Sequence, residues 1–365
     1  MTTVRPAETV DVVGQLSVID RFLPVWIIAA MVLGLGLGKA FPGIGPALDS
    51  VKLANVSLPI AIGLFWMMYP VLARVRYEAM GEMPARGRLF GASLLFNWVL
   101  GPILMFALAW LFLPDMPAYR TGLIMIGLAR CIAMVLLWNT LAEGESEAAA
   151  VMVALNSVFQ IVMYAGLGYF FLTVVPGWFG AGATALHISM WDIAKSVLIF
   201  LGIPLAAGAL TRLVGIRAKG AEWYDTVLMA RIGPLALLGL LYTIVLMFSM
   251  QGGRIIGLPM DVVRIAIPLL AYFVIIFGLA FAVSRAMGFT YAETAALSFT
   301  ATGNNFELAI AVAIGTFGIA SSEALAAVVG PLIEVPALVA LVYVSLWLKK
   351  RWFPQDPPAL IRDCG

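Results

Sequence analysis

Chemically reactive side chains lie inside two long apolar segments of the chain. The first segment contains Arg130 and Cys131, and the second contains Glu307 just after the run 303–305. A charge at the middle of a bilayer costs roughly 2.5–3.5 kcal/mol on the insertion scale, so such residues usually have a partner or a task. A thiol can bind a soft centre and a carboxylate can carry a proton. These two places therefore predict binding and proton chemistry within a membrane.

The polar run Gly303, Asn304 and Asn305 is unfavourable inside a helix, because Gly loosens the backbone and Asn side chains compete for its hydrogen bonds. We expect a local break there that lines a polar cavity; polar packing in an intact helix is the alternative. For Arg130 and Glu307 the alternative to a transport role is a structural ion pair. Cys131 is either a functional thiol or a small apolar filler.

A third intramembrane carboxylate, Glu334, lies between Pro331 and Pro336. Two prolines so close together indicate another bent, cavity-lining segment. The acidic run Glu143, Glu145 and Glu147 is interpreted as a solvated turn. Asn97 and Asn156 are interpreted as partners in interhelical hydrogen bonds.

Composition identifies the elements that must position these residues. The chain has 365 residues, of which 62% are hydrophobic and 12% charged, about half the charge of a soluble domain. Runs such as 89–113, 148–175 and 232–253 reach the roughly 20 apolar residues that cross a bilayer, and in lipid they must be helical. We expect ten spans, at 22–41, 53–73, 89–113, 121–142, 148–175, 193–212, 230–251, 262–284, 292–319 and 324–348.

Basic residues predict the orientation of these spans. With the N-terminus inside, fifteen Lys and Arg residues fall on the inside and six on the outside. The inside set is Arg5, Arg21, Arg74, Arg76, Arg86, Arg88, Arg212, Arg217, Lys219, Arg231, Arg285, Lys349, Lys350, Arg351 and Arg362; the outside set is Lys39, Lys52, Arg120, Lys195, Arg254 and Arg264. Both termini are therefore expected in the cytoplasm.

An internal repeat relates the two halves of the chain. With a constant shift of 172 residues, seven of the 25 positions from 20 to 44 match 192 to 216, and Tyr119 falls on Tyr291. Cys131 then falls on Gly303. Five spans per half make the repeats inverted, which is typical of secondary transporters whose site lies at broken helices near the midplane. We expect a cytoplasmic segment 1–21, repeats at 22–175 and 192–348, and a cytoplasmic tail 349–365.

Other function classes lack their signals in this sequence. A net charge of +2 does not indicate nucleic acid binding, and Cys131 and Cys364 do not form a disulfide framework. Zinc-enzyme signatures, Ser-His pairings and a Walker motif are absent, and the single His187 lies in a loop. We therefore expect neither an enzyme nor a cofactor. A membrane sensor is disfavoured because there is no output domain.

The reactive segments resemble those of a known family. Residues 128–135 (LARCIAMV), 303–313 (GNNFELAIAVA) and 330–336 (GPLIEVP) are similar to the arsenite permeases of the arsenical-resistance family, within the bile acid/arsenite/riboflavin transporter superfamily. The resemblance extends over essentially the whole chain. It implies an all-α polytopic membrane protein of ten helices in two inverted five-helix repeats, with a panel domain, a core domain, and broken helices 4 and 9 that cross. It also implies arsenite efflux in exchange for protons through Cys131 and Glu307.

The resulting hypothesis is a carrier in the cytoplasmic membrane whose partners are trivalent arsenic, protons and the lipid bilayer. Cys131 would be a transient As(III) ligand, Asn304 and Asn305 would bind the hydroxyls, and Glu307 would be the proton site. Gly303, Arg130 and Glu334 complete the candidate site. Antimonite is a second candidate cargo. A sodium-coupled organic-anion symporter of the same fold is the alternative, although it gives Cys131 no task.

Overall fold

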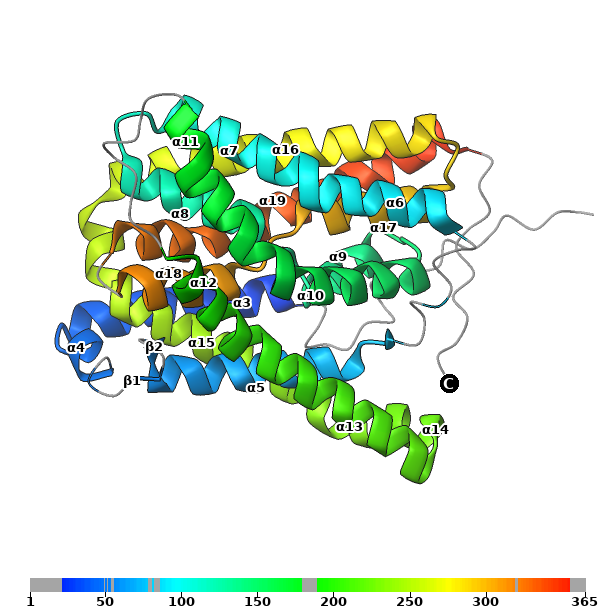
Figure 1. Ribbon diagram of the computed structural model, residues 1–365, viewed down its shortest axis with the longest axis horizontal. Helices are drawn as coiled ribbons and strands as arrows, with labels where there is room; N and C mark the ends of the chain where they lie inside the picture. Colours follow the sequence, from blue (N-terminus) through cyan, green and yellow to red (C-terminus); the bar gives the residue numbers. More distant parts are fainter. Residues whose placement is uncertain are drawn as a thin grey trace, which may run out of the picture.

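The computed structural model describes residues 22–48, 50, 52–53, 56–77, 81, 86–178, 189–318 and 321–354. His187, Cys364, the segment 1–21 and the end of the tail lie outside these residues. In the described part nearly all regular structure is helical, and most helices run side by side along the long axis of the molecule (Figure 1). The small exception is a hairpin of two short antiparallel strands, β1 (Lys52–Leu53) and β2 (Val56–Ser57).

Each expected span falls on a helical segment, and the spans divide into three kinds. The uninterrupted α-helices are α3 (Leu23–Ala40), α5 (Leu58–Arg74), α16 (Pro259–Ala286) and α19 (Ser322–Trp352), with the short α4 (Ile44–Leu48) after α3. The helices with a π-helical turn are α6–η2–α7 (Gly87–Leu95, Phe96–Leu100, Gly101–Phe112), α10–η3–α11 (Ser146–Tyr169, Phe170–Val174, Val175–Trp178), α12–η5–α13 (Met190–Val197, Leu198–Gly202, Ile203–Lys219) and α14–η6–α15 (Ala221–Trp223, Tyr224–Leu228, Met229–Gly257). The interrupted helices are α8/α9 (Pro117–Leu128, Val135–Leu141) and α17/α18 (Tyr291–Thr302, Phe306–Phe317).

The all-α polytopic class is confirmed. Six helical segments of the described chain are long and apolar enough to cross a membrane, and three shorter apolar helices accompany them. One expectation needs correction. The span expected from residue 53 begins with the hairpin, and its helix starts only at Leu58, where Pro59 favours a first helical turn. Helix α19 is α-helical throughout, with Pro331 and Pro336 inside it, and the bend expected there stays a prediction.

Proline accounts for three of the π-helical turns. Pro102, Pro176 and Pro204 each lie two residues after the end of such a turn. A proline inside a helix has no N–H, and its ring clashes with the carbonyl group four residues earlier. The extra residue of a π-helical turn moves that carbonyl away, so the helix continues across the membrane without a break.

The helices form two groups. We call α3, α5, α13 and α15 the panel; α3 and α5 both pack along α15, and α13 packs along α5. We call α6 to α10 and α16 to α19 the core, in which α8 and α16 pack against α19. Figure 1 shows the panel helices below the core helices. This arrangement matches the two domains that the family resemblance implied.

The two interrupted helices lie antiparallel at the centre of the core. Helix α8 packs against α18, and α9 packs against α17. The chain therefore passes the centre in one direction through α8 and α9 and in the other through α17 and α18 (Figure 1). The gaps, at 129–134 and 303–305, also coincide under the 172-residue shift. Both facts fit inverted repeats, whose boundaries remain a prediction.

Ion pairs join the helix ends on one side of the core. Arg86, before α6, donates hydrogen bonds to Glu145 (2.6 Å) and Glu293 (2.5 Å), and Lys349 of α19 donates to Glu143 (2.5 Å). The Glu145 carboxylate, with Glu293, raises the pKa of the Arg86 guanidinium above its usual range. Glu143 and Glu145 thus lie partly exposed at a turn, as expected, and also form ion pairs that the sequence did not indicate, because their partners come from distant parts of the chain.

The panel depends on close contact between α3 and α15. A Cβ atom added at Gly34 would lie 2.7 Å from both the Cβ of Phe248 and the carbonyl oxygen of Val245, whereas one added at Gly36 would meet nothing within 4 Å. In membranes, packing between small residues replaces the hydrophobic effect as a source of helix association.

We expect Gly34→Ala to lower the thermal unfolding midpoint of the detergent-purified protein, because overpacking costs about 1–3 kcal/mol. Gly36→Ala is the matched control on the same helix. It should leave the midpoint unchanged or raise it, since Ala favours the helix more than Gly does. Equal effects of the two changes would contradict the described contact between α3 and α15.

Candidate functional site

The two unwound segments pair with each other at the centre of the core. The Cys131 N–H donates to the Gly303 carbonyl (3.2 Å), and the Asn305 N–H donates to the Ala129 carbonyl (3.0 Å). Arg130 and Asn304 thus form an isolated antiparallel bridge. Unwound backbone is tolerated at membrane depth only where its polar groups are satisfied within the protein. Each break supplies partners for the other.

The Asn304 side chain holds the crossing together. Its amide nitrogen donates to the carbonyls of Ile126 (2.8 Å) and Ala129 (3.1 Å), which are freed where α8 ends. Its backbone N–H donates to the Glu334 carboxylate of α19 (3.2 Å). Asn304 therefore connects three parts of the core, and its remaining polar atom, Oδ1, is buried without a partner in the described structure.

Asn305 caps the second half of the interrupted helix. Its side-chain oxygen accepts a hydrogen bond from the Leu308 N–H (3.0 Å), one of the free donors at the start of α18. The side-chain nitrogen of Asn305 is buried without a partner among the described residues. Two adjacent amides thus leave one acceptor and one donor unused.

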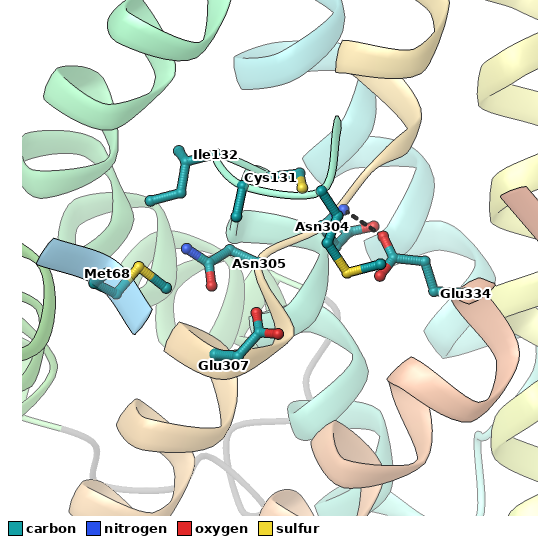
Figure 2. Close-up of a pocket in the computed structure, with 9 residues that line it drawn as sticks. Met68, Cys131, Ile132, Asn304, Asn305, Glu307 and Glu334 are labelled. Atoms are coloured by element: carbon teal, nitrogen blue, oxygen red, sulfur yellow. Dashed lines mark hydrogen bonds between the residues drawn. The ribbon is translucent and has the colours of Figure 1, made fainter. Parts of the chain in front are cut away.

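These groups surround a small cavity. The lining residues are Met68, Cys131, Ile132, Ala133, Met134, Asn304, Asn305, Glu307 and Glu334. Figure 2 shows Cys131, the two Asn residues and the two Glu residues around one central space, with Met68 on the opposite side. Met68 comes from α5 of the panel and the others from the core, so the cavity lies where the two groups of helices meet.

Electropositive helix ends face this cavity. Glu307 lies in the first turn of α18, where the helix dipole and free N–H groups favour negative charge. The N–H groups of Ala133 and Val135, where α9 begins, lie against the Cys131 sulfur. Glu307 is only half-buried, whereas Glu334 is 3% exposed and already accepts a hydrogen bond. Of the two carboxylates, Glu307 is the one free to exchange partners.

Most of the residues expected from the sequence meet here. Cys131, Asn304, Asn305, Glu307 and Glu334 line the cavity directly. Gly303 lies behind Cys131; a Cβ atom added to it would be 2.9 Å from the Cys131 Cβ, so a side chain has no room there.

Arg130 is placed differently. Its side chain does not line the cavity, and it donates instead to the Tyr272 hydroxyl (2.9 Å) and to the carbonyls of Ala301 (3.4 Å) and Gly127. No ion pair of the described residues includes it. The structural ion pair considered for Arg130 and Glu307 is therefore not formed.

Sequence reasoning missed other residues of this region. Gln160 of α10 is fully buried and its side-chain oxygen accepts from the Arg130 N–H. The sequence signal that could have identified Gln160 is that it is the lone glutamine in the uncharged run 148–175. Met68 and Met134 gave no signal, because methionine is common in membrane packing. Asn97 and Asn156, by contrast, form the expected interhelical hydrogen bond (3.4 Å).

Comparison with known proteins agrees with the motifs. The family model described as Sodium Bile acid symporter family matches residues 61–258. The arsenical-resistance protein Acr3 of Corynebacterium glutamicum is 54% identical over 94% of this chain and 93% of its own length. The Acr3 protein of Alkaliphilus metalliredigens is 30% identical over 92% of this chain and 94% of its own, and an uncharacterized transporter of Synechocystis sp. is 34% identical over 94% and 92%.

The helices, the crossing of two interrupted segments and these matches over nearly the full length lead to one assignment. The chain is a multi-pass membrane protein of the Sodium Bile acid symporter family and belongs, within it, with the Acr3-type arsenical-resistance proteins.

Proposed function

We propose that this protein carries trivalent arsenic out of the cell across the cytoplasmic membrane in exchange for protons. The observation that carries the proposal is the cavity in which one thiol, two amides with unused polar atoms and a half-buried carboxylate meet. Relatives named as arsenical-resistance proteins at 54% and 30% identity support this cargo.

The chemistry of the cavity suits arsenous acid. This cargo is small and uncharged at neutral pH, and its hydroxyl groups both donate and accept hydrogen bonds. Asn304 Oδ1 offers the unused acceptor and Asn305 Nδ2 the unused donor. Both atoms are buried, and an unsatisfied buried polar group costs about 1–3 kcal/mol. A hydroxyl-bearing cargo relieves that cost at two points, which an apolar cargo cannot do.

Cys131 supplies the contact selective for arsenic. Its sulfur displaces one hydroxyl from As(OH)₃, so that one S–As bond forms, one As–O bond breaks, and the hydroxyl leaves as water with the thiol proton. Water reverses the step on release. Cys131 is the only cysteine in the lining. One thiol suits a carrier, because a cage of three would hold arsenic too tightly to release.

Glu307 is the proposed proton site. When ionised, its carboxylate accepts charge-assisted hydrogen bonds from the cargo hydroxyls; when protonated from outside, it loses the negative charge and one acceptor oxygen and binds them more weakly. Cargo and proton then compete for the Glu307 carboxylate, and this competition couples efflux of the cargo to entry of the proton. One proton that crosses a membrane potential of about 100 mV supplies about 2.3 kcal/mol. A tenfold concentration ratio corresponds to about 1.4 kcal/mol, so one-for-one exchange with a neutral cargo sustains a concentration gradient of roughly fifty-fold.

The place of the cavity fits alternating access. Met68 belongs to the panel, and the remaining lining residues belong to the core. Rocking of one group of helices against the other exposes such a site to each side in turn. We place both termini in the cytoplasm on the excess of basic residues in the inside segments. Antimonite, a similar hydroxide with a larger central atom, is a second cargo of the same chemistry.

The second candidate is sodium-coupled symport of an organic anion, which the name of the matched family favours. The lining argues against it, because a sodium-coupled organic-anion site gives the Cys131 thiol no task. A sodium requirement for uptake would favour this candidate.

We expect everted vesicles to accumulate arsenite only with a proton gradient, and Cys131→Ala to reduce the initial rate about tenfold or more, the equivalent of about 1.4 kcal/mol. Cys364→Ala removes the other cysteine and is the control. Arsenite accumulation that does not depend on the proton gradient would refute antiport. Undiminished transport by Cys131→Ala would refute the role of the thiol.

We expect Glu307→Gln to abolish gradient-driven accumulation while arsenite counterflow between preloaded vesicles and medium persists, because the amide binds hydroxyls but cannot carry the proton. Glu334→Gln is the matched comparison. Its side-chain oxygen can still accept from the Asn304 N–H, so coupling should survive. Normal accumulation by Glu307→Gln would assign the proton to another group.

A further inference from the structure

The half-helices α8 and α17 both end at the crossing, where the two unwound segments pair. A helix leaves its last four carbonyl groups without intrahelical partners, and the dipole makes that end negative. Here two such ends share one buried region, because α8 ends at Leu128 and α17 at Thr302. The Gly127 and Ala301 carbonyls belong to these last turns.

The Arg130 guanidinium lies between these two ends. The side chain is fully buried and donates to the Ala301 carbonyl from one terminal nitrogen and to the Gly127 carbonyl from the other. The first nitrogen also donates to the Tyr272 hydroxyl (2.9 Å). Its partners are thus three neutral oxygens, two of them at negative helix ends.

Neutral oxygens at helix C-terminal ends are also groups that contribute ligands to a bound alkali cation. In transporters with interrupted helices, unwound carbonyls and half-helix C-terminal ends are the groups that coordinate sodium. The family to which this chain belongs is named for sodium symport. The position that suits a mobile cation is filled here by a cation attached to the chain.

We propose that Arg130 is a tethered cation that replaces sodium at the paired C-terminal ends of α8 and α17, and that it makes the carrier independent of sodium. It is a positioning residue: it holds the two half-helices in register so that Cys131 and Asn304, its neighbours in the paired segments, keep their places. Arginine suits this task because its charge is permanent and its planar fork donates to several carbonyls at once.

Two neighbours fit this assignment. The Arg130 backbone N–H donates to the side-chain oxygen of Gln160, which anchors the unwound segment beside α10. Gly101 of α7 leaves the space for the guanidinium, since a Cβ atom added there would lie 2.8 Å from the Arg130 Nη1. Helix α10 thus holds the backbone of Arg130, and helix α7 leaves the space for its side chain.

The test is thermal unfolding of the full-length protein in detergent, in equal concentrations of sodium, potassium or choline chloride. The wild-type midpoint should be the same in all three salts. Arg130→Met should unfold several degrees lower in choline and recover part of that loss in sodium, because the vacated oxygens then bind the free ion. Arg130→Lys, which keeps a tethered charge, should show less loss and no response to sodium.

Arg120→Met is the matched control. Arg120 is also buried, stacks on Trp110 (3.8 Å) and donates to the Pro114 carbonyl (3.2 Å), far from the crossing. Its loss should lower the midpoint equally in all salts. A sodium response of the wild type, or an Arg130→Met midpoint that is the same in sodium and choline, would overturn the proposal.

If Arg130→Met does not fold, Gly101→Ala provides the second variant, because it displaces the guanidinium without removing it and should create the same selective response to sodium. The unfolding experiment needs no arsenic, so its outcome does not depend on the proposed function. The claim that transport is independent of sodium does rest on that function. If transport is independent of sodium, wild-type arsenite uptake should be unchanged when choline replaces sodium. Uptake that requires sodium would overturn this claim.

Discussion

The mutual pairing of two interrupted helices is the constraint on which this molecule depends. Backbone groups freed at 129–134 and 303–305 have no water to bind within a membrane, so each break must be satisfied by protein. They are satisfied by each other, through the bonds of Cys131 to Gly303 and of Asn305 to Ala129, and by the Asn304 side chain. Each break thus supplies hydrogen-bond partners to the other.

The crossing separates charge. Two helix C-terminal ends lie against the Arg130 guanidinium, and the start of α18 faces the cavity with Glu307 in its first turn. One side of the crossing is therefore held by a permanent positive charge, whereas the other presents N–H groups to exchangeable ligands. The same break in the helices produces a rigid joint and a binding surface a few residues apart.

The cavity gains its chemistry from what the pairing leaves unused. The side chains of Asn304 and Asn305 form hydrogen bonds to backbone groups at helix ends. The acceptor Asn304 Oδ1 and the donor Asn305 Nδ2 remain without partners among the described residues. Cys131 is held beside Gly303, where no side chain fits. Because Met68 of the panel lies opposite these core residues, the cavity is lined by both groups of helices.

The sequence by itself determined the helical membrane class, the approximate spans, the two polar interruptions and five residues of the cavity lining, because apolar length and intramembrane polarity are local properties. The tertiary structure alone decided which groups meet. It placed Arg130 at the helix C-terminal ends rather than beside Glu307, paired Arg86 with Glu145 and Glu293, brought Met68 to the cavity and kept α19 continuous through its prolines. The physical reason is that partners far apart in the chain are chosen by packing geometry. A buried charge requires compensation, but its sequence neighbourhood does not state from which helix that compensation comes.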